Sequence, residues 1–100
     1  MAMTSVQLTV EVEKAIRSYL TKVRIEDGGD TDFGVSPFHL YTVIEKQFSG
    51  HNLSAGFFNK IVADMRHAGI VSENKRNSRV WLSDDAWASY QWATKNGVQS

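Results

Sequence analysis

The chain has 100 residues, 42% of them hydrophobic and 22% charged, which is the composition of one small globular domain. The absence of cysteine excludes disulfides, thiolate catalysis and cysteine-based zinc sites. No apolar run approaches the roughly 20 residues that a helix needs to cross a bilayer, and residues 1–5 lack the pattern of a signal peptide. We therefore expect a cytoplasmic protein without a membrane segment.

The charge is balanced over the whole chain but unevenly distributed. Eleven Lys and Arg residues match eleven Asp and Glu residues, so the formal net charge is zero. Residues 54–82, however, carry five basic side chains and two acidic ones, a net charge of +3. This stretch is the part of the chain best suited to an anionic partner.

The first predicted elements are a short extended arm and a helix. Apolar and polar residues alternate over 6–12, which favours a strand, but apolar residues recur every three or four positions over 12–23. We predict a helix that begins near Thr9 or Val10 and ends near Arg24. Acidic residues stand beside its basic residues, which we interpret as a solubilising face: Lys14, Arg17, Lys22 and Arg24.

Residues 25–36 are expected to form a solvated acidic loop, because they contain two adjacent glycines and four acidic residues. A calcium site is disfavoured, since Gly34 stands where a third acid would be needed and no Glu closes a twelve-residue loop.

Two helices joined by a short turn follow. Ser36 is the expected N-cap of the first, with Pro37 at its first position, and Gly50 is expected to end it. Ser54 is expected to cap the second, and Gly69 to follow it in the left-handed conformation. The predicted apolar stripes are Leu40, Tyr41, Ile44 and Phe48, then Phe57, Phe58, Ile61, Val62 and Met65.

A β-hairpin and a last helix complete the chain. Apolar segments at 70–73 and 79–82 surround the polar tip 74–78, as in a hairpin. Ser83 is expected to cap the last helix, which Gly97 closes. The predicted fold class is therefore mainly α with one small β-hairpin, in the order α-α-α-β-β-α.

This order, together with residues 53–58, 65–71 and 79–86, resembles the winged helix-turn-helix superfamily, in particular bacterial regulators like the MarR and PadR families. The resemblance implies a single domain over 1–100, with a helix-turn-helix at about 36–69, a wing at about 70–82 and a C-terminal helix at about 83–96. It also implies a homodimer on a two-fold DNA operator.

The candidate DNA contacts lie on the second helix of the helix-turn-helix and on the hairpin. In a major groove, Asn59 is suited to adenine and Lys60 to guanine or phosphate, while the small Ala55 and Gly56 allow close approach. The hairpin cations would bind phosphates or a minor groove. The full set is Ser54, Ala55, Gly56, Asn59, Lys60, Lys75, Arg76 and Arg79. A solvated helix face and an ordinary charged hairpin tip are the alternative interpretation.

The last helix is the candidate dimer interface. Trp87 and Tyr90 share one face, whereas Trp92 lies about 140° around the helix from Trp87. One core-facing stripe can hardly bury both indoles, so we expect Trp87, Tyr90 and Trp92 to form a homodimer surface, with Trp92 the most exposed.

No enzyme, cofactor or metal site is predicted. The histidines His39, His51 and His67 lack ligand spacing, and no nucleophile or phosphate-loop motif is present. The main hypothesis is a DNA-binding transcriptional regulator. The alternative is a winged-helix protein–protein module, such as a complex subunit or inhibitor, which the neutral charge, the acidic loop and the aromatic last helix favour. A continuous positive surface over the second helix and the hairpin would favour DNA, and an interrupting acid would favour the alternative.

Overall fold

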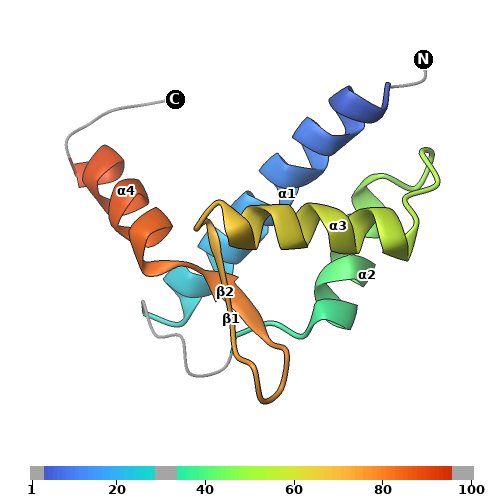
Figure 1. Ribbon diagram of the computed structural model, residues 1–100. Coiled ribbons are helices and arrows are strands. Elements are labelled where there is room, and N and C mark those ends of the chain that lie inside the picture. The colour runs from blue at the N-terminus through green and yellow to red at the C-terminus, as the bar shows by residue number, and fades with distance from the viewer. Residues whose placement is uncertain (1–3, 29–33, 96–100) are drawn as a thin grey trace.

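The computed structural model describes residues 4–28 and 34–95, which form four helices and one two-stranded antiparallel sheet. Figure 1 shows α3 crossing α1, with α2 at the N-terminal end of α3 and the hairpin and α4 at its other end. The expected mainly helical fold with one β-hairpin is confirmed. The elements are α1 (Ser5–Glu26), α2 (Pro37–Gln47), α3 (Ala55–His67), β1 (Val71–Glu73), β2 (Val80–Leu82) and α4 (Asp84–Lys95).

Helix α1 begins earlier and ends later than predicted. The Thr4 hydroxyl accepts a hydrogen bond from the Gln7 amide at 3.1 Å, and the Gln7 side-chain carbonyl accepts one from the Thr4 amide at 3.0 Å. This reciprocal capping box satisfies two backbone donors, and so stabilises a helix where the alternating pattern favoured a strand. The predicted extended arm is therefore wrong, and Ile25 and Glu26 belong to α1 rather than to a loop.

The predicted acidic loop is described only in part, since residues 29–33, with Asp30 and Asp32, lie outside the described residues. Val35 pairs with Val80 of β2 through two backbone hydrogen bonds of 2.8 and 2.9 Å. The preceding Gly34 has a φ of +59°, and a Cβ there would lie 3.1 Å from the Val80 carbonyl oxygen. The segment before α2 therefore pairs with β2 at one residue, like a very short third strand. The sequence did not predict this pairing.

The predicted caps of α2 and α3 are confirmed. The Ser36 hydroxyl accepts from the His39 amide, and the Ser54 hydroxyl accepts from the Phe57 amide, both at 3.1 Å. Helix α2 ends at Gln47, before Gly50, and the left-handed residue of the turn is Asn52, with a φ of +51°.

Tyr41 fixes the turn between α2 and α3. Its hydroxyl donates to the Leu53 carbonyl at 2.7 Å, and its ring packs edge-on against Phe58 at a centroid distance of 5.3 Å. The Tyr41 side chain therefore holds the turn against α2, and its hydroxyl satisfies the backbone carbonyl of the buried Leu53.

Helix α3 ends in a Schellman motif. The Ile70 amide donates to the Met65 carbonyl at 3.0 Å, and the Gly69 amide donates to the Arg66 carbonyl at 3.1 Å. Gly69 has the predicted left-handed conformation, with a φ of +79°. The chain turns directly into the hairpin, in which Val71 pairs with Leu82.

The hydrophobic core lies where α1, α2, α3 and the hairpin meet. The buried side of α3 confirms the predicted stripe, with Phe57 and Val62 at its half-buried edges. Helix α4 contributes no fully buried residue. The buried apolar residues are Val12, Ile16, Leu20, Val35, Leu40, Ile44, Leu53, Phe58, Ile61, Met65, Val71, Val80 and Leu82.

Candidate nucleic-acid interface

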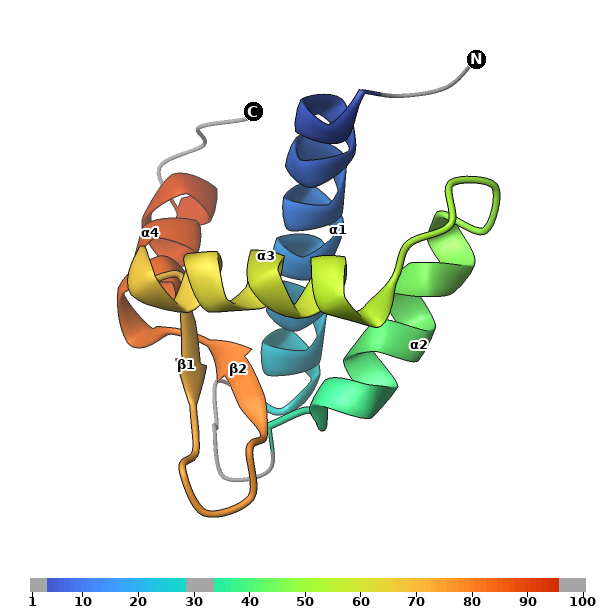
Figure 2. The same ribbon diagram turned by 45° about the vertical axis from the view of Figure 1, so that its right-hand side comes forward.

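Helix α3 is buried on one side only. Figure 2 shows α3 in front of α1, with the hairpin extending from its C-terminal end. All five α3 candidates predicted from the sequence are exposed, together with Asp64 and His67 on the same helix. One side of α3 is therefore available to a partner, and it includes the polar residues Asn59, Lys60, Asp64 and His67. The five are Ser54, Ala55, Gly56, Asn59 and Lys60.

The hairpin tip is fixed by asparagine side chains. The Asn74 side-chain carbonyl accepts from the Arg76 amide at 2.8 Å, and the Asn77 side-chain carbonyl accepts from the Arg79 amide at 3.0 Å. The Ser78 amide donates to the Asn74 carbonyl at 2.8 Å, and Ser78 is left-handed, with a φ of +61°. These local bonds give a short tip a defined shape.

The three hairpin cations are exposed, as predicted, but they are not equivalent. The Arg79 guanidinium donates to the Gly34 carbonyl at 3.4 Å, which links it to the segment before α2. Among the described residues, Lys75 and Arg76 form no salt bridge, and neither does Lys60 on α3. Lys60, Lys75 and Arg76 are therefore the cations that an anionic partner would meet first.

Two acidic residues interrupt this positive surface. Arg66 of α3 forms a 3.2 Å salt bridge with Glu73 of β1, so their charges offset each other. Asp64 is exposed one turn after Lys60. The surface over α3 and the hairpin is positive in total but not continuous, which is the outcome that was expected to favour a protein partner over DNA.

Arg24 is the side chain that the sequence interpretation placed wrongly. It is only 7% exposed, and its guanidinium donates to the Leu82 carbonyl at 2.7 Å and to Asp84 at 2.8 Å. It also lies 5.1 Å from the centre of the Trp87 ring, a cation–π distance. Arg24 therefore belongs to the interior and not to a solubilising face. Its position four residues after the buried Leu20 was the signal that could have found it.

Helix α4 begins as predicted, with the Ser83 hydroxyl accepting from the Ala86 amide at 3.1 Å; Gly97 lies outside the described residues. Trp87 is half-buried and stacks on Tyr90 at 5.6 Å between ring centres. Tyr90 is 37% exposed and Trp92 62% exposed. The prediction that Trp92 is the most exposed of the three aromatic residues is confirmed.

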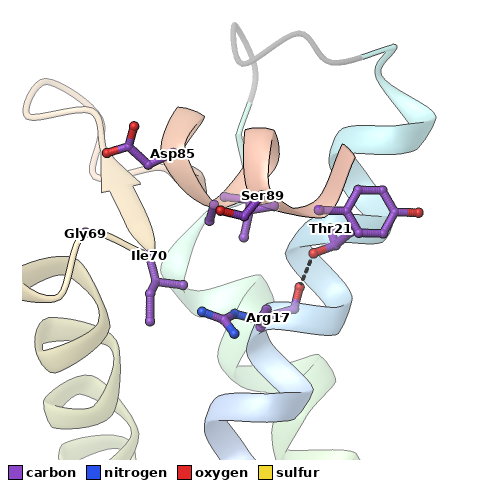
Figure 3. Close-up of a pocket in the computed structure, with 9 residues that line it drawn as sticks. Arg17, Thr21, Gly69, Ile70, Asp85 and Ser89 are labelled. Atoms are coloured by element: carbon purple, nitrogen blue, oxygen red, sulfur yellow. Dashed lines mark hydrogen bonds between the residues drawn. The ribbon is translucent and has the colours of Figure 1, made fainter. Parts of the chain in front are cut away.

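A cavity of about 400 Å³ lies between α1 and α4. Figure 3 shows Arg17 and Thr21 on the α1 side, Asp85 and Ser89 on the α4 side, and Ile70 beside Gly69 at a third side of the cavity. A second cavity of about 240 Å³ shares Arg17 and Ile70 and continues along α1 to Val10. We call the first cavity the α1–α4 groove; the second lies beside it, between α1 and the C-terminal end of α3.

Within residues 4–28 and 34–95, no group of three or more His, Asp or Glu side chains is arranged to hold a metal ion. In the same part of the chain, no helix is both long and apolar enough to span a bilayer. Comparison with protein-family models, with curated proteins and with solved structures gave no match to this chain.

Proposed function

We propose that this protein is a non-enzymatic, cytoplasmic DNA-binding protein of the winged helix-turn-helix type, and that it acts as a transcriptional regulator. In this proposal α3 enters the major groove and the hairpin contacts the DNA backbone as a wing. The observation that carries the proposal is the one-sided burial of α3. Its free side has Asn59 and Lys60, and the hairpin that follows it has Lys75 and Arg76 at its tip.

The dimensions of α3 agree with this role. A helix of 13 residues is about 20 Å long, and the major groove, about 12 Å wide, admits one α-helix. An asparagine side chain can form two hydrogen bonds with adenine, and a lysine can donate to guanine or to a phosphate. The hairpin cations would add contacts that position the protein without reading sequence.

The test is a double substitution, Asn59→Ala with Lys60→Ala, in a binding selection from randomised DNA duplexes. We expect the wild-type protein to enrich a preferred sequence and the double variant to lose that preference, because each base contact contributes about 1–3 kcal/mol to discrimination. The control is Lys46→Ala with Gln47→Ala, which removes a neighbouring lysine and amide from exposed positions on α2. An unchanged preference in the α3 variant would exclude α3 from the reading role.

We propose further that the α1–α4 groove and the exposed side of α4 bind a second copy of the chain. Tyr90 and Trp92 are the exposed aromatic residues of α4 that would contact the second copy. Trp87 contacts Arg24 and stacks on Tyr90, so it would hold the Tyr90 ring in place. Helix α4 begins with two acidic residues and ends at Lys95, so an antiparallel pair of α4 helices would bring opposite charges together. Such a two-fold dimer would place two α3 helices on a two-fold DNA site.

A winged-helix module that binds a protein is the second candidate. Asp64 and the Arg66–Glu73 salt bridge support it, because they interrupt the positive surface. A wild-type protein that binds no duplex at any salt concentration would favour this candidate.

A further inference from the structure

We propose that Asp64 selects the base that it faces in the major groove, favouring cytosine or adenine, whose N4 or N6 amino group donates a hydrogen bond there, over guanine or thymine. This inference rests on the proposed DNA-binding function. It concerns an acidic side chain that would otherwise oppose that function, because phosphates repel carboxylates.

Asp64 has no role in holding the protein together that the structure shows. Its side chain is exposed, and among the described residues it makes no hydrogen bond or salt bridge. The neighbouring Arg66 is paired with Glu73 at 3.2 Å, and Lys60, four residues earlier, is not within salt-bridge distance.

The position of Asp64 in α3 is also unfavourable for the helix. It lies in the last turn, where the Asp64 carbonyl accepts the capping Ala68 amide at 2.9 Å. The negative end of the helix dipole repels a carboxylate there, and aspartate is a weak helix former. An uncharged side chain would suit α3 better, so the fold gives no reason for this carboxylate.

Hydrogen-bond chemistry limits what this carboxylate can contact in a major groove. An ionised carboxylate only accepts hydrogen bonds. Guanine presents two acceptors in the major groove and thymine an acceptor and a methyl group, so both are unfavourable partners. Cytosine N4 and adenine N6 are the donors. Asp64 would therefore favour two of the four bases and reject the other two.

Asp64 lies on the same helix as the other proposed reading residues. It follows Lys60 by one turn, which is about 6 Å along the helix axis. Lys60 is suited to guanine and Asn59 to adenine, whereas Asp64 is suited to an amino group. Lys60 and Asp64 share one side of α3, whereas Asn59 lies about 140° around the helix from Asp64. Lys60 and Asp64 would thus read neighbouring base pairs with different hydrogen-bond chemistry, and the rejection by Asp64 would add specificity.

The experiment compares the wild-type protein with Asp64→Asn in a binding selection from randomised duplexes at fixed salt. The matched control is Glu11→Gln, which removes one negative charge from an exposed position on α1. We expect Asp64→Asn to lose about tenfold discrimination at one base pair while the preferences at the other positions remain, since an amide can both accept and donate. A thermal unfolding midpoint no lower than that of the wild type would show that the variant is folded.

Two results would overturn the inference while the proposed function stands. In the first, Asp64→Asn binds all duplexes more tightly with no change in base preference, which would mean that Asp64 only repels phosphates. In the second, Asp64→Asn behaves as the Glu11→Gln control does. A wild-type protein that binds no duplex would overturn the proposed function and this inference with it.

Discussion

At the scale of single residues, Arg24 joins three elements of the fold. Arg24 lies near the C-terminal end of α1. Its guanidinium donates to the carbonyl of Leu82, the last residue of β2, and to the carboxylate of Asp84, the first residue of α4. The Leu82 carbonyl and the Trp87 ring enclose the guanidinium, while the Asp84 carboxylate remains exposed. Helix α4 has no fully buried residue, but Ala86 and Trp87 pack partly buried against the core, and the Arg24 contact and the Ser83 hydrogen bonds add to this packing.

Arg24→Met is therefore expected to destabilise the protein by about 1–3 kcal/mol, since it leaves the buried Leu82 carbonyl without its donor. In a domain of this size each kcal/mol lowers the unfolding midpoint by about 4–8 °C. The control is Lys22→Met, which replaces a cation at an exposed position of α1 with the same side chain. Equal midpoints for the two variants, measured by circular dichroism, would contradict the role of Arg24.

At the scale of elements, the sequence predicted several helix ends correctly, because they depend on hydrogen bonds between neighbouring residues. The Ser36, Ser54 and Ser83 caps and the left-handed Gly69 depend on neighbouring backbone groups, and all of them are confirmed. The start of α1 lies earlier than predicted because the Thr4 capping box stabilises a helix over residues whose alternating pattern favours a strand.

Contacts between distant segments could not be predicted in the same way. Val35 and Val80 are 45 residues apart, so their pairing produces no pattern in the sequence around either residue. The Arg66–Glu73 salt bridge likewise depends on how the hairpin turns back from α3. The exposed side of α3 was predicted because the spacing of its apolar residues determines which side is buried, whereas the salt bridge between Arg66 and Glu73 needed the structure.

The hairpin tip supplies a prediction of its own. If Lys75 and Arg76 each bind one phosphate, Lys75→Ala with Arg76→Ala should reduce the slope of log affinity against log salt by about 1.8, because each bound phosphate accounts for about 0.9 of that slope. Fluorescence anisotropy with a labelled duplex at several salt concentrations measures this slope. Lys14→Ala with Lys22→Ala on α1 is the control for total charge. A hairpin variant with the control's slope would show that the tip does not touch DNA.

At the scale of the whole molecule, the proposed dimer would bring two α3 helices, one from each copy, to the same DNA site. Trp92→Ala is expected to weaken self-association about 30-fold, as for an aromatic residue that contributes about 2 kcal/mol at an interface. Sedimentation equilibrium should give the wild type a mass near twice the 11.2 kDa of one chain. Phe38→Ala is the control, because Phe38 is an exposed aromatic residue on α2. A wild-type mass of one chain at all concentrations would end the dimer proposal.

In the proposed function, the free side of α3 and the hairpin tip together form the surface that binds DNA. Amide chemical shifts of the labelled protein, recorded while a duplex from the binding selection is added, test it most directly. If this surface binds DNA, the largest changes lie in residues 54–64 and 74–79, with small changes along α1. Changes confined to the α1–α4 groove, or no changes at saturating duplex and low salt, would contradict it.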